Sequence, residues 1–509
     1  MAALLPPETK IQVVQALGGA SEAAAAARRA DAVLLWLAPD VLEGRWPRVP
    51  WRRALAARLA REPRPRCGSV LLELDTEEDG RPVRVVAACV EEDASAFARL
   101  ERARALAARV LAVRPREVAV WAPGAGARAP ALLEAAVAAL LAAAQPMPSL
   151  AREAQPPPVP RRVRLLGLGR RLDLAATLAG ARGNHLARWL AALPPNVLTP
   201  DAYVRAARRL ARRHGWRTRF LDRRALERAG AGAFLAVTRA GSRGAGILHL
   251  AYRPRRREHP PLALVGKGVC FDTGGVNLKP ARHMQGMHAD MQGSAVVLGT
   301  LAALTELRWP GPVDAWLAIA ENLVGPEAYR PHEVVRAADG TTIEVVHTDA
   351  EGRMLLADAL ALAARARPAA ILDYATLTGA CIYALGPRMS GVFSNREALH
   401  APLVEAGRES GERVWPFPAE PDYDEALRSE VADIRQCTLE GEADHILAAR
   451  FLSRFVPKGI PWVHVDLAAA EHKGGLAHVP TRLTGFGVRW TLALLGDERR
   501  RARLLEAAG

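Results

Sequence analysis

Two short segments of the chain concentrate the residue types that hold metal ions and stabilise negative charge. The first, residues 264–290 (LVGKGVCFDTGGVNLKPARHMQGMHAD), contains Lys267, Asp272, Lys279 and Asp290. Glycines on both sides of Lys267 and a Gly-Gly pair after Asp272 allow the backbone to bend tightly around a bound group. By itself this pattern is equally compatible with an ordinary ion-pair cluster on a surface loop.

The second segment, residues 343–358 (IEVVHTDAEGRMLLAD), places Asp349 and Glu351 one residue apart. Alternate residues of an extended segment point the same way, so we expect these carboxylates to converge. Like charges so close repel unless a cation lies between them. With Asp272 and Asp290 they would form an oxygen-rich site for two divalent metals, although a solvated Asp-x-Glu turn is the plainer alternative. His347 precedes Asp349 by the same two-residue step, and we expect its ring on the same face.

The two lysines of the first segment are unusual in this chain. Only five of its 69 basic residues are lysine, and the others are arginine. Arginine stays protonated, whereas lysine can lose its proton in a suitable site. Lys267 and Lys279 are therefore candidates for chemistry that arginine cannot perform.

Other catalytic signatures are absent from the sequence. It contains no His-Glu-x-x-His motif, no Gly-x-Ser-x-Gly nucleophile elbow, no Gly-x-Gly-x-x-Gly after a strand and no Cys-x-x-Cys pair. Gly266-Lys267 is not a phosphate-binding loop, because no hydroxyl residue follows the lysine. Cys270 has no obvious histidine base, so we expect it to pack.

Length and composition indicate a globular protein of two to four domains. The chain has 509 residues, of which 50% are hydrophobic and 24% charged; these values exclude disordered and collagen-like classes. Five scattered cysteines predict no disulfide framework and favour a reducing compartment. No secretory signal opens the sequence. The alanine-rich stretch 129–144 is shorter than a membrane span and is expected to be a buried helix.

The positive charge of the chain is concentrated in its middle. The net charge is +15, and residues 151–258 alone carry 24 Lys and Arg against 6 Asp and Glu. Such a stretch can bind nucleic acid. A solvated face or a subunit contact is the simpler interpretation, since aromatic residues that stack on bases are sparse there.

Alternating strand and helix patterns predict an α/β fold. Residues 1–158 read as a small N-terminal α/β domain that ends in a proline-rich run. Residues 159–193 are expected to form a linker and a connecting helix. Residues 194–509 are expected to form a larger domain with a mixed, mostly parallel sheet covered by helices. The functional side chains of such sheets gather at strand ends.

The sequence resembles the leucyl aminopeptidase (cytosol aminopeptidase) family of dinuclear zinc exopeptidases over residues 180–490. The resemblance rests on two site motifs, VGKGV at 265–269 followed by FDTGG at 271–275, and TDAEGR at 348–353. It is supported by DYATLTG at 373–379, and further by Glu321-Asn322, AYRP at 328–331, PNVLTP at 195–200, WVHVD at 462–466 and TGFGVR at 484–489. The first 160 residues match only in general design.

The resemblance implies roles for the matching positions. Two divalent metals, zinc as first choice with manganese or magnesium as alternatives, would be held by Lys267, Asp272, Asp290, Asp349 and Glu351, with Asp272 and Glu351 bridging. Lys279 and Arg353 would be the catalytic residues, the former polarising the scissile carbonyl and the latter holding an anion such as bicarbonate. Substrate-binding residues would be Met287, His347, Thr376, Leu377 and Gly379. The family also implies a homo-hexamer and peptide substrates. Cysteine use, the lack of a secretory signal and the short apolar stretch predict a cytoplasmic location and no membrane association.

Several positions depart from the family pattern without removing a ligand. His347 stands where asparagine is usual, His288 where lysine is common, and the 440–445 loop lacks the glycines typical there. These changes bear on substrate preference and pH dependence. The leading hypothesis is a metal-dependent aminopeptidase. The alternatives are a nucleic-acid-binding protein or a catalytically silent scaffold built on the same fold.

Overall fold

The computed structural model describes residues 3–241 and 243–505, which divide into two compact units. One unit is formed by Pro7–Ala181 together with Lys473–Arg482. The other is formed mainly by Arg182–His472 and the segment that starts at Leu483. Each unit has its own sheet.

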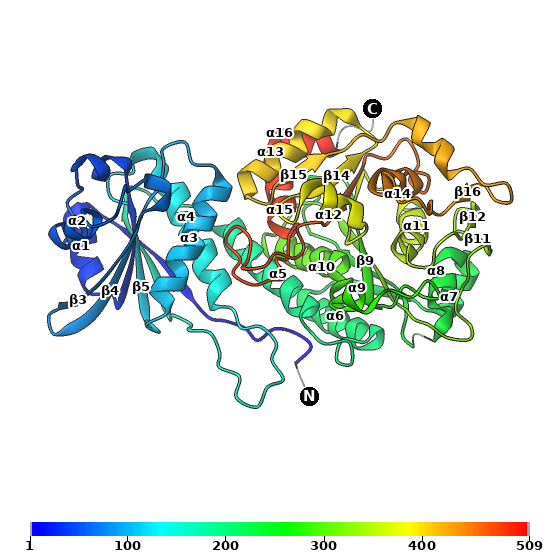
Figure 1. Ribbon diagram of the computed structural model, residues 1–509, viewed down its shortest axis with the longest axis horizontal. Coiled ribbons are helices and arrows are strands. Elements are labelled where there is room, and N and C mark those ends of the chain that lie inside the picture. Colours follow the sequence, from blue (N-terminus) through cyan, green and yellow to red (C-terminus); the bar gives the residue numbers. More distant parts are fainter. Residues whose placement is uncertain (1–2, 242, 506–509) are drawn as a thin grey trace. The chain divides into compact units, whose positions relative to one another are not determined.

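The N-terminal unit is a six-stranded sheet with helices on both faces (Figure 1). The strand order is β1-β6-β5-β2-β4-β3, in which the β3–β4 pair is antiparallel and the other pairs are parallel. The central strand β2 is buried along its whole length, as expected of a parallel strand covered on both sides. The elements are β1 (Gln12–Leu17), α1 (Ala20–Arg28), β2 (Ala32–Leu37), α2 (Arg52–Leu59), β3 (Leu71–Glu78), β4 (Arg81–Cys89), α3 (Ala96–Leu111), β5 (Glu117–Trp121), α4 (Ala129–Ala144) and β6 (Arg162–Leu168).

Strand β6 corrects the expected boundary at residue 158. The segment 159–193 was expected to hold a linker and a connecting helix, but its residues Arg162–Leu168 pair in parallel with β1 and β5. The proline-rich run is therefore a connection between α4 and a strand of the same sheet. The helix that follows, α5 (Ala175–Ala191), agrees with the expected connecting helix.

Two further features of this unit concern compartment and membrane association. Cys67 and Cys89 form a disulfide, which the cysteine count did not predict. The antiparallel pairing of β3 with β4 brings the two residues together, and one such pair is no disulfide framework. Helix residues Gly126–Ala144 are long and apolar enough to cross a membrane by length and composition alone, yet 61% of that window is buried in the protein, as in a core helix.

The larger unit contains an eight-stranded mixed sheet of order β15-β14-β17-β13-β9-β10-β8-β7. The four central strands β17, β13, β9 and β10 run parallel, and their carboxyl ends therefore share one edge. A small sheet of β11, β12 and β16 lies in the same unit. The strands are β7 (Arg217–Leu221), β8 (Gly246–Tyr252), β9 (Leu262–Asp272), β10 (Val313–Asn322), β11 (Val334–Arg336), β12 (Thr342–Glu344), β13 (Ala370–Ala375), β14 (Ser390–Ser394), β15 (Val414–Pro416), β16 (Ile434–Arg435) and β17 (Trp462–Asp466).

Helices cover both faces of this sheet, which confirms the predicted fold class (Figure 1). Helix α10 packs on one face of β9 and α11 on the other. The helices are α6 (Pro200–His214), α7 (Arg223–Ala229), α8 (Gly232–Val237), α9 (Ala281–Met284), α10 (Gln292–Glu306), α11 (Glu351–Ala364), α12 (Gly379–Leu385), α13 (His400–Ser410), α14 (Asp444–Ser453), α15 (Val488–Gly496) and α16 (Glu498–Leu505).

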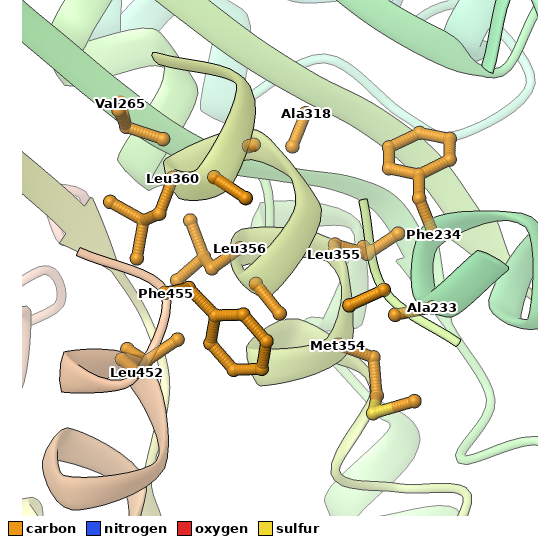
Figure 2. Close-up of a cluster of buried hydrophobic side chains, with 14 of the residues drawn as sticks. Ala233, Phe234, Val265, Ala318, Met354, Leu355, Leu356, Leu360, Leu452 and Phe455 are labelled. Atoms are coloured by element: carbon orange, nitrogen blue, oxygen red, sulfur yellow. The ribbon is translucent and has the colours of Figure 1, made fainter. Parts of the chain in front are cut away.

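Helix α11 is the centre of the main hydrophobic core. Every residue of this helix is buried, because α8, α14 and the sheet surround it. Figure 2 shows its Leu355, Leu356 and Leu360 among Phe234 of α8 and Val265 of β9. Its many alanines let the neighbouring elements approach closely. The first turn of this rigidly held helix carries Glu351 and Arg353.

Candidate active site

Strand β9 carries two of the candidate ligands at different depths. This strand continues to Asp272, so Lys267 lies inside it. A Cβ at Gly266 would come within 2.5 Å of the Ser294 backbone in α10, so this face of the strand lies directly against that helix. Successive strand residues alternate between faces, and Lys267 therefore points to the α11 side.

Three buried carboxylates meet on that side of the sheet. Asp272, Asp290 and Glu351 each present a ligand atom within 4.8 Å of the others. Asp272 ends β9, Asp290 precedes α10 and Glu351 is the first residue of α11. Lys267 Nζ lies 2.8 Å from both Asp290 Oδ2 and Glu351 Oε1, and it donates to the Thr376 carbonyl at 3.0 Å.

Lys279 and Asp349 complete a second pairing next to the first. Lys279 Nζ lies 2.9 Å from Asp272 Oδ2 and also contacts Asp349 Oδ1. The sequence suggested that Asp349 and Glu351 converge as alternate residues of an extended segment. They do not, because they are not on a strand. The strand β12 ends at Glu344 and helix α11 begins at Glu351, so Asp349 lies in the turn between them. Each carboxylate reaches the site from a different backbone conformation.

The carboxylates of the site are short of positive charge. Burial and repulsion from Asp272 raise the pKa of Glu351, and the same two effects raise the pKa of Asp290, although Lys267 opposes both shifts. Burial likewise opposes the charged form of Lys267, but the surrounding carboxylates outweigh it and raise the pKa of this lysine. Two ammonium groups thus face four carboxylates, an imbalance that divalent cations can correct.

A second observation also indicates that the side chains of this cluster suit divalent metals. Glu351 Oε2 and Asn322 Oδ1 are buried oxygens with no hydrogen-bond partner. Buried polar atoms are normally paired, so an oxygen left free beside three other carboxylates is suited to a cation. Oxygen ligands with one amine nitrogen are within the range that zinc, manganese and magnesium accept.

A turn with two consecutive glycines holds the loop between Asp272 and Lys279. Gly274 and Gly275 have φ values of +87° and +67°, which other residues rarely adopt. Thr348 closes the turn: its hydroxyl donates to the Gly274 carbonyl at 2.6 Å and accepts from Asn277 N at 2.9 Å. The segment that carries Asp349 is thereby tied to the segment that carries Lys279.

His347 has a local partner rather than a place among the carboxylates. Its Nδ1 accepts a hydrogen bond from the backbone N–H of Asp349 at 3.2 Å, and its own N–H donates to Gln436 Oε1 at 3.1 Å. An asparagine side-chain oxygen makes the same bond to the second residue on in an Asx-turn. The prediction that His347 and Asp349 share one face of a strand is therefore wrong, because this segment is a turn.

Three of the candidate substrate residues, Thr376, Leu377 and Gly379, follow the carboxyl end of β13. Thr376 Oγ1 donates to Asp290 Oδ1 at 2.7 Å, which links this loop to the cluster. Leu377 is half-buried and its N–H donates to Asp466 Oδ1 at 3.2 Å, while Gly379 is the first residue of α12. Met287 is half-buried in the short turn that leads to Asp290.

Arg353 is buried in the first turn of α11 but bonds to residues outside the cluster. Its Nη2 donates to Asp444 Oδ1 at 2.6 Å and its Nη1 to the Gln436 carbonyl at 3.2 Å. Both partners lie more than 80 residues further along the chain, and Asp444 belongs to the 440–445 loop that departs from the family pattern.

Three more residues support the site and were not proposed as site residues. Asn322 Nδ2 donates to Asp272 Oδ1 at 2.9 Å, and Tyr329 OH donates to the Thr348 carbonyl at 2.7 Å. Gln436 accepts from Val346 and His347 and donates to the Ala350 carbonyl. Asn322 and Tyr329 belong to motifs that match the family, so their motifs could have identified them as site residues. Gln436 belongs to no such motif.

Comparison with known proteins identifies the family of this chain. A model of the cytosol aminopeptidase family, catalytic domain, matches residues 185–492. A probable cytosol aminopeptidase of Syntrophotalea carbinolica is 45% identical over 330 residues, which are 64% of this chain and 66% of that protein. One from Parasynechococcus marenigrum is 44% identical over 322 residues, 62% of this chain and 65% of that protein. These matches thus span just under two thirds of the length of the two relatives.

Solved structures are similar over nearly the whole chain. The bottromycin maturation enzyme BotP in complex with Mn has a TM-score of 0.78 and 33% identity, and the match covers 91% of this chain and 98% of that one. A mutant of tomato leucine aminopeptidase has a TM-score of 0.81 and 27% identity, with 96% and 97% covered. The family predicted from the sequence motifs is confirmed: this chain belongs to the cytosol aminopeptidase family.

Proposed function

We propose that this protein is a metal-dependent aminopeptidase that releases N-terminal residues from peptides. The observation that carries the proposal is the buried cluster of Asp272, Asp290 and Glu351 with Lys267 in a chain of the cytosol aminopeptidase family. Paired carboxylates with too little positive charge around them suit a dinuclear metal site better than a structural ion-pair network.

Five residues are proposed to hold two divalent ions. They are Lys267, Asp272, Asp290, Asp349 and Glu351, of which Asp272 and Glu351 would be shared by both ions. Such a pair of ions would supply an activated water nucleophile at neutral pH. Zinc is our first choice; manganese, which the BotP complex contains, and magnesium are the alternatives.

The chain's own residues supply substrate orientation and charge stabilisation. Lys279 has a largely buried ammonium group at the edge of the cluster, where a fixed charge can stabilise a developing oxyanion. Thr376, Leu377 and Gly379 line the end of β13, and we propose that this loop and Met287 bind the N-terminal residue of the peptide. Asp466 fixes the loop through Leu377 and Thr378.

Assembly and location follow from the family rather than from contacts of this chain. We propose a homo-hexamer and a cytoplasmic location, the latter supported by the name of the relatives. Light scattering at micromolar protein concentration tests the assembly, and a monomer there contradicts it.

Nucleic-acid binding and a silent scaffold are not favoured. Part of the basic stretch is already compensated, since Arg205 pairs with Asp201, Arg223 with Glu227 and Arg253 with Asp314. The candidate metal ligands and Lys279 are also all present, whereas a silent scaffold has no need of them.

Activity on a panel of aminoacyl anilides and dipeptides, measured together with metal content, tests the proposal. We expect two divalent metals per chain and release of the N-terminal residue. Asp290→Asn should lose metal and turnover together, whereas the exposed control Glu425→Gln should keep both. Full activity in protein that is free of metal would contradict the proposed function.

A further inference from the structure

Arg353 is a buried cation that forms an ion pair with a carboxylate of the protein, Asp444. The residue is 2% exposed and sits in the first turn of α11. Its Nη2 donates to Asp444 Oδ1 at 2.6 Å, and its Nη1 donates to a main-chain carbonyl. An unpaired charge at this depth is strongly destabilising, so Arg353 requires an anion. In the part of the chain that the structure describes, Asp444 provides it.

The backbone around Asp444 is arranged to present this carboxylate. Asp444 is the first residue of the ten-residue helix α14, and an acidic side chain is favourable at a helix N-terminus. Ala443 precedes it with a φ of +52°, in the left-handed region that non-glycine residues rarely adopt. Such a strained conformation persists only where the surrounding structure enforces it.

The bond from Asp444 takes up the part of Arg353 that an added anion needs. An arginine binds small planar anions best through two parallel N–H donors. In Arg353, Nη2 is already bonded to a carboxylate and Nη1 to the Gln436 carbonyl, so every parallel pair of donors includes a nitrogen that the protein engages. Nε has no partner, but it is buried as well. The residues present therefore do not fit the bicarbonate that the family resemblance implies for this arginine.

We infer that Asp444 is the permanent anion of Arg353, so that this protein uses its own carboxylate where bicarbonate was expected. Asp444 is 28% exposed on its side chain, whereas Arg353 is almost fully enclosed. Removal of this side chain opens a path from solvent to the guanidinium and leaves a vacant anion site of carboxylate size. The inference rests on the proposed aminopeptidase function only where turnover is the measurement.

The test compares the full-length, metal-loaded protein with Asp444→Ala and Asp444→Asn in buffers freed of carbon dioxide. Glu442→Ala is the matched control, because Glu442 is an exposed acidic residue of the same loop. Turnover is measured with and without millimolar bicarbonate, acetate or formate. Binding of ¹³C-labelled bicarbonate is followed by NMR, and metal content and thermal unfolding are recorded for each protein.

We expect bicarbonate neither to bind Arg353 in the unaltered protein nor to change its turnover, and Glu442→Ala to behave in the same way. Asp444→Ala should lose turnover about tenfold or more, since it leaves a buried charge unpaired. It should then bind bicarbonate and recover part of its turnover with bicarbonate, acetate or formate. Asp444→Asn, which keeps the shape and is the better folded variant, should lose turnover without recovery.

Dependence of the unaltered protein on bicarbonate would overturn the inference, as would full turnover of Asp444→Ala without any added anion. Failure of Asp444→Ala to bind labelled bicarbonate, in folded protein with its metals, would also overturn it. If the unaltered protein lacks aminopeptidase activity, the proposed function fails, while the binding comparison still decides the role of Asp444.

Discussion

Replacement of Gly352 by alanine should separate the stability of the protein from the function of its metal site. Gly352 is the second residue of α11 and has no left-handed φ, so alanine fits the backbone. Alanine in a helix is more favourable than glycine by roughly 0.5–1 kcal/mol. In open space the substitution would therefore stabilise the protein.

The space beside Gly352 is not open, because the Lys267 side chain crosses it. A Cβ at this position would lie 2.7 Å from Lys267 Cε and 2.8 Å from Nζ, and ordinary contact begins at 3.4 Å. The lysine end must retreat by about 0.7 Å, the difference between 2.7 and 3.4 Å. The flexible chain can yield at small cost, but its Nζ then leaves positions 2.8 Å from Asp290 and Glu351. A misplacement near 1 Å at a reacting centre can cost about 100-fold.

We therefore expect Gly352→Ala to lose metal affinity and turnover by about 10- to 100-fold. Its metal-free form should unfold at a temperature close to that of the unaltered protein, because the gain in helix propensity is offset by weaker Lys267 ion pairs. Thermal unfolding, chelator competition with metal analysis, and steady-state kinetics measure the three quantities. Gly496→Ala, at the end of α15 with nothing within 4 Å of the new Cβ, is the matched control. Native metal affinity and turnover in Gly352→Ala would refute the reasoning.

Three further predictions concern single side chains. Lys279→Arg should keep both metals but lose about 2.7–4 kcal/mol of transition-state stabilisation, because the wider guanidinium misplaces the charge. Normal turnover of metal-loaded Lys279→Arg would exclude Lys279 as the group that stabilises the oxyanion. Lys267→Arg should instead lose metal first. Burial raises the pKa of Asp358 from 3.8 to about 7, so the folded state holds a proton that the unfolded chain releases in this window. The free energy of unfolding should fall as pH rises between these values, by up to about 1.4 kcal/mol per pH unit; urea titrations should show a smaller slope in Asp358→Asn, and an equal slope would contradict the assignment. His347→Asn should keep turnover and metal affinity, because asparagine can accept the same hydrogen bond from Asp349 N. His347→Ala cannot accept this bond and should bind metal more weakly. Equal metal affinities in the two variants would count against the His347 ring as the group that positions Asp349.

The sequence alone indicated the chemistry of the site because side-chain identity decides what can hold a metal. Lys267 and Lys279 were notable among 64 arginines, and the carboxylates stood in two short segments. The alternation of strands and helices likewise predicted the α/β class, since periodicity is a local property. The glycines at 274 and 275 predicted a tight turn, and both adopt positive φ.

Local patterns misjudged the boundaries where long-range contacts decide the backbone. Lys267 lies inside strand β9 rather than in the loop after it, because β10 pairs with this strand as far as Asp272. Asp349 and Glu351 were expected on one strand, but a buried helix begins at Glu351. Strand β6 was not expected at all, because its pairing with β1 and β5 spans up to 151 residues, from Leu17 to Leu168.

The tertiary structure alone decided the partners of the site residues. Arg353 and Asp444 are 91 residues apart, and Gln436 reaches the 346–350 turn over a similar separation. The spacing of residues in the sequence does not predict these contacts, because they depend on how α11 and α14 pack against each other. The sequence thus determined which groups this protein has for chemistry, while the packing of its helices on the sheet decided which charge each of them faces.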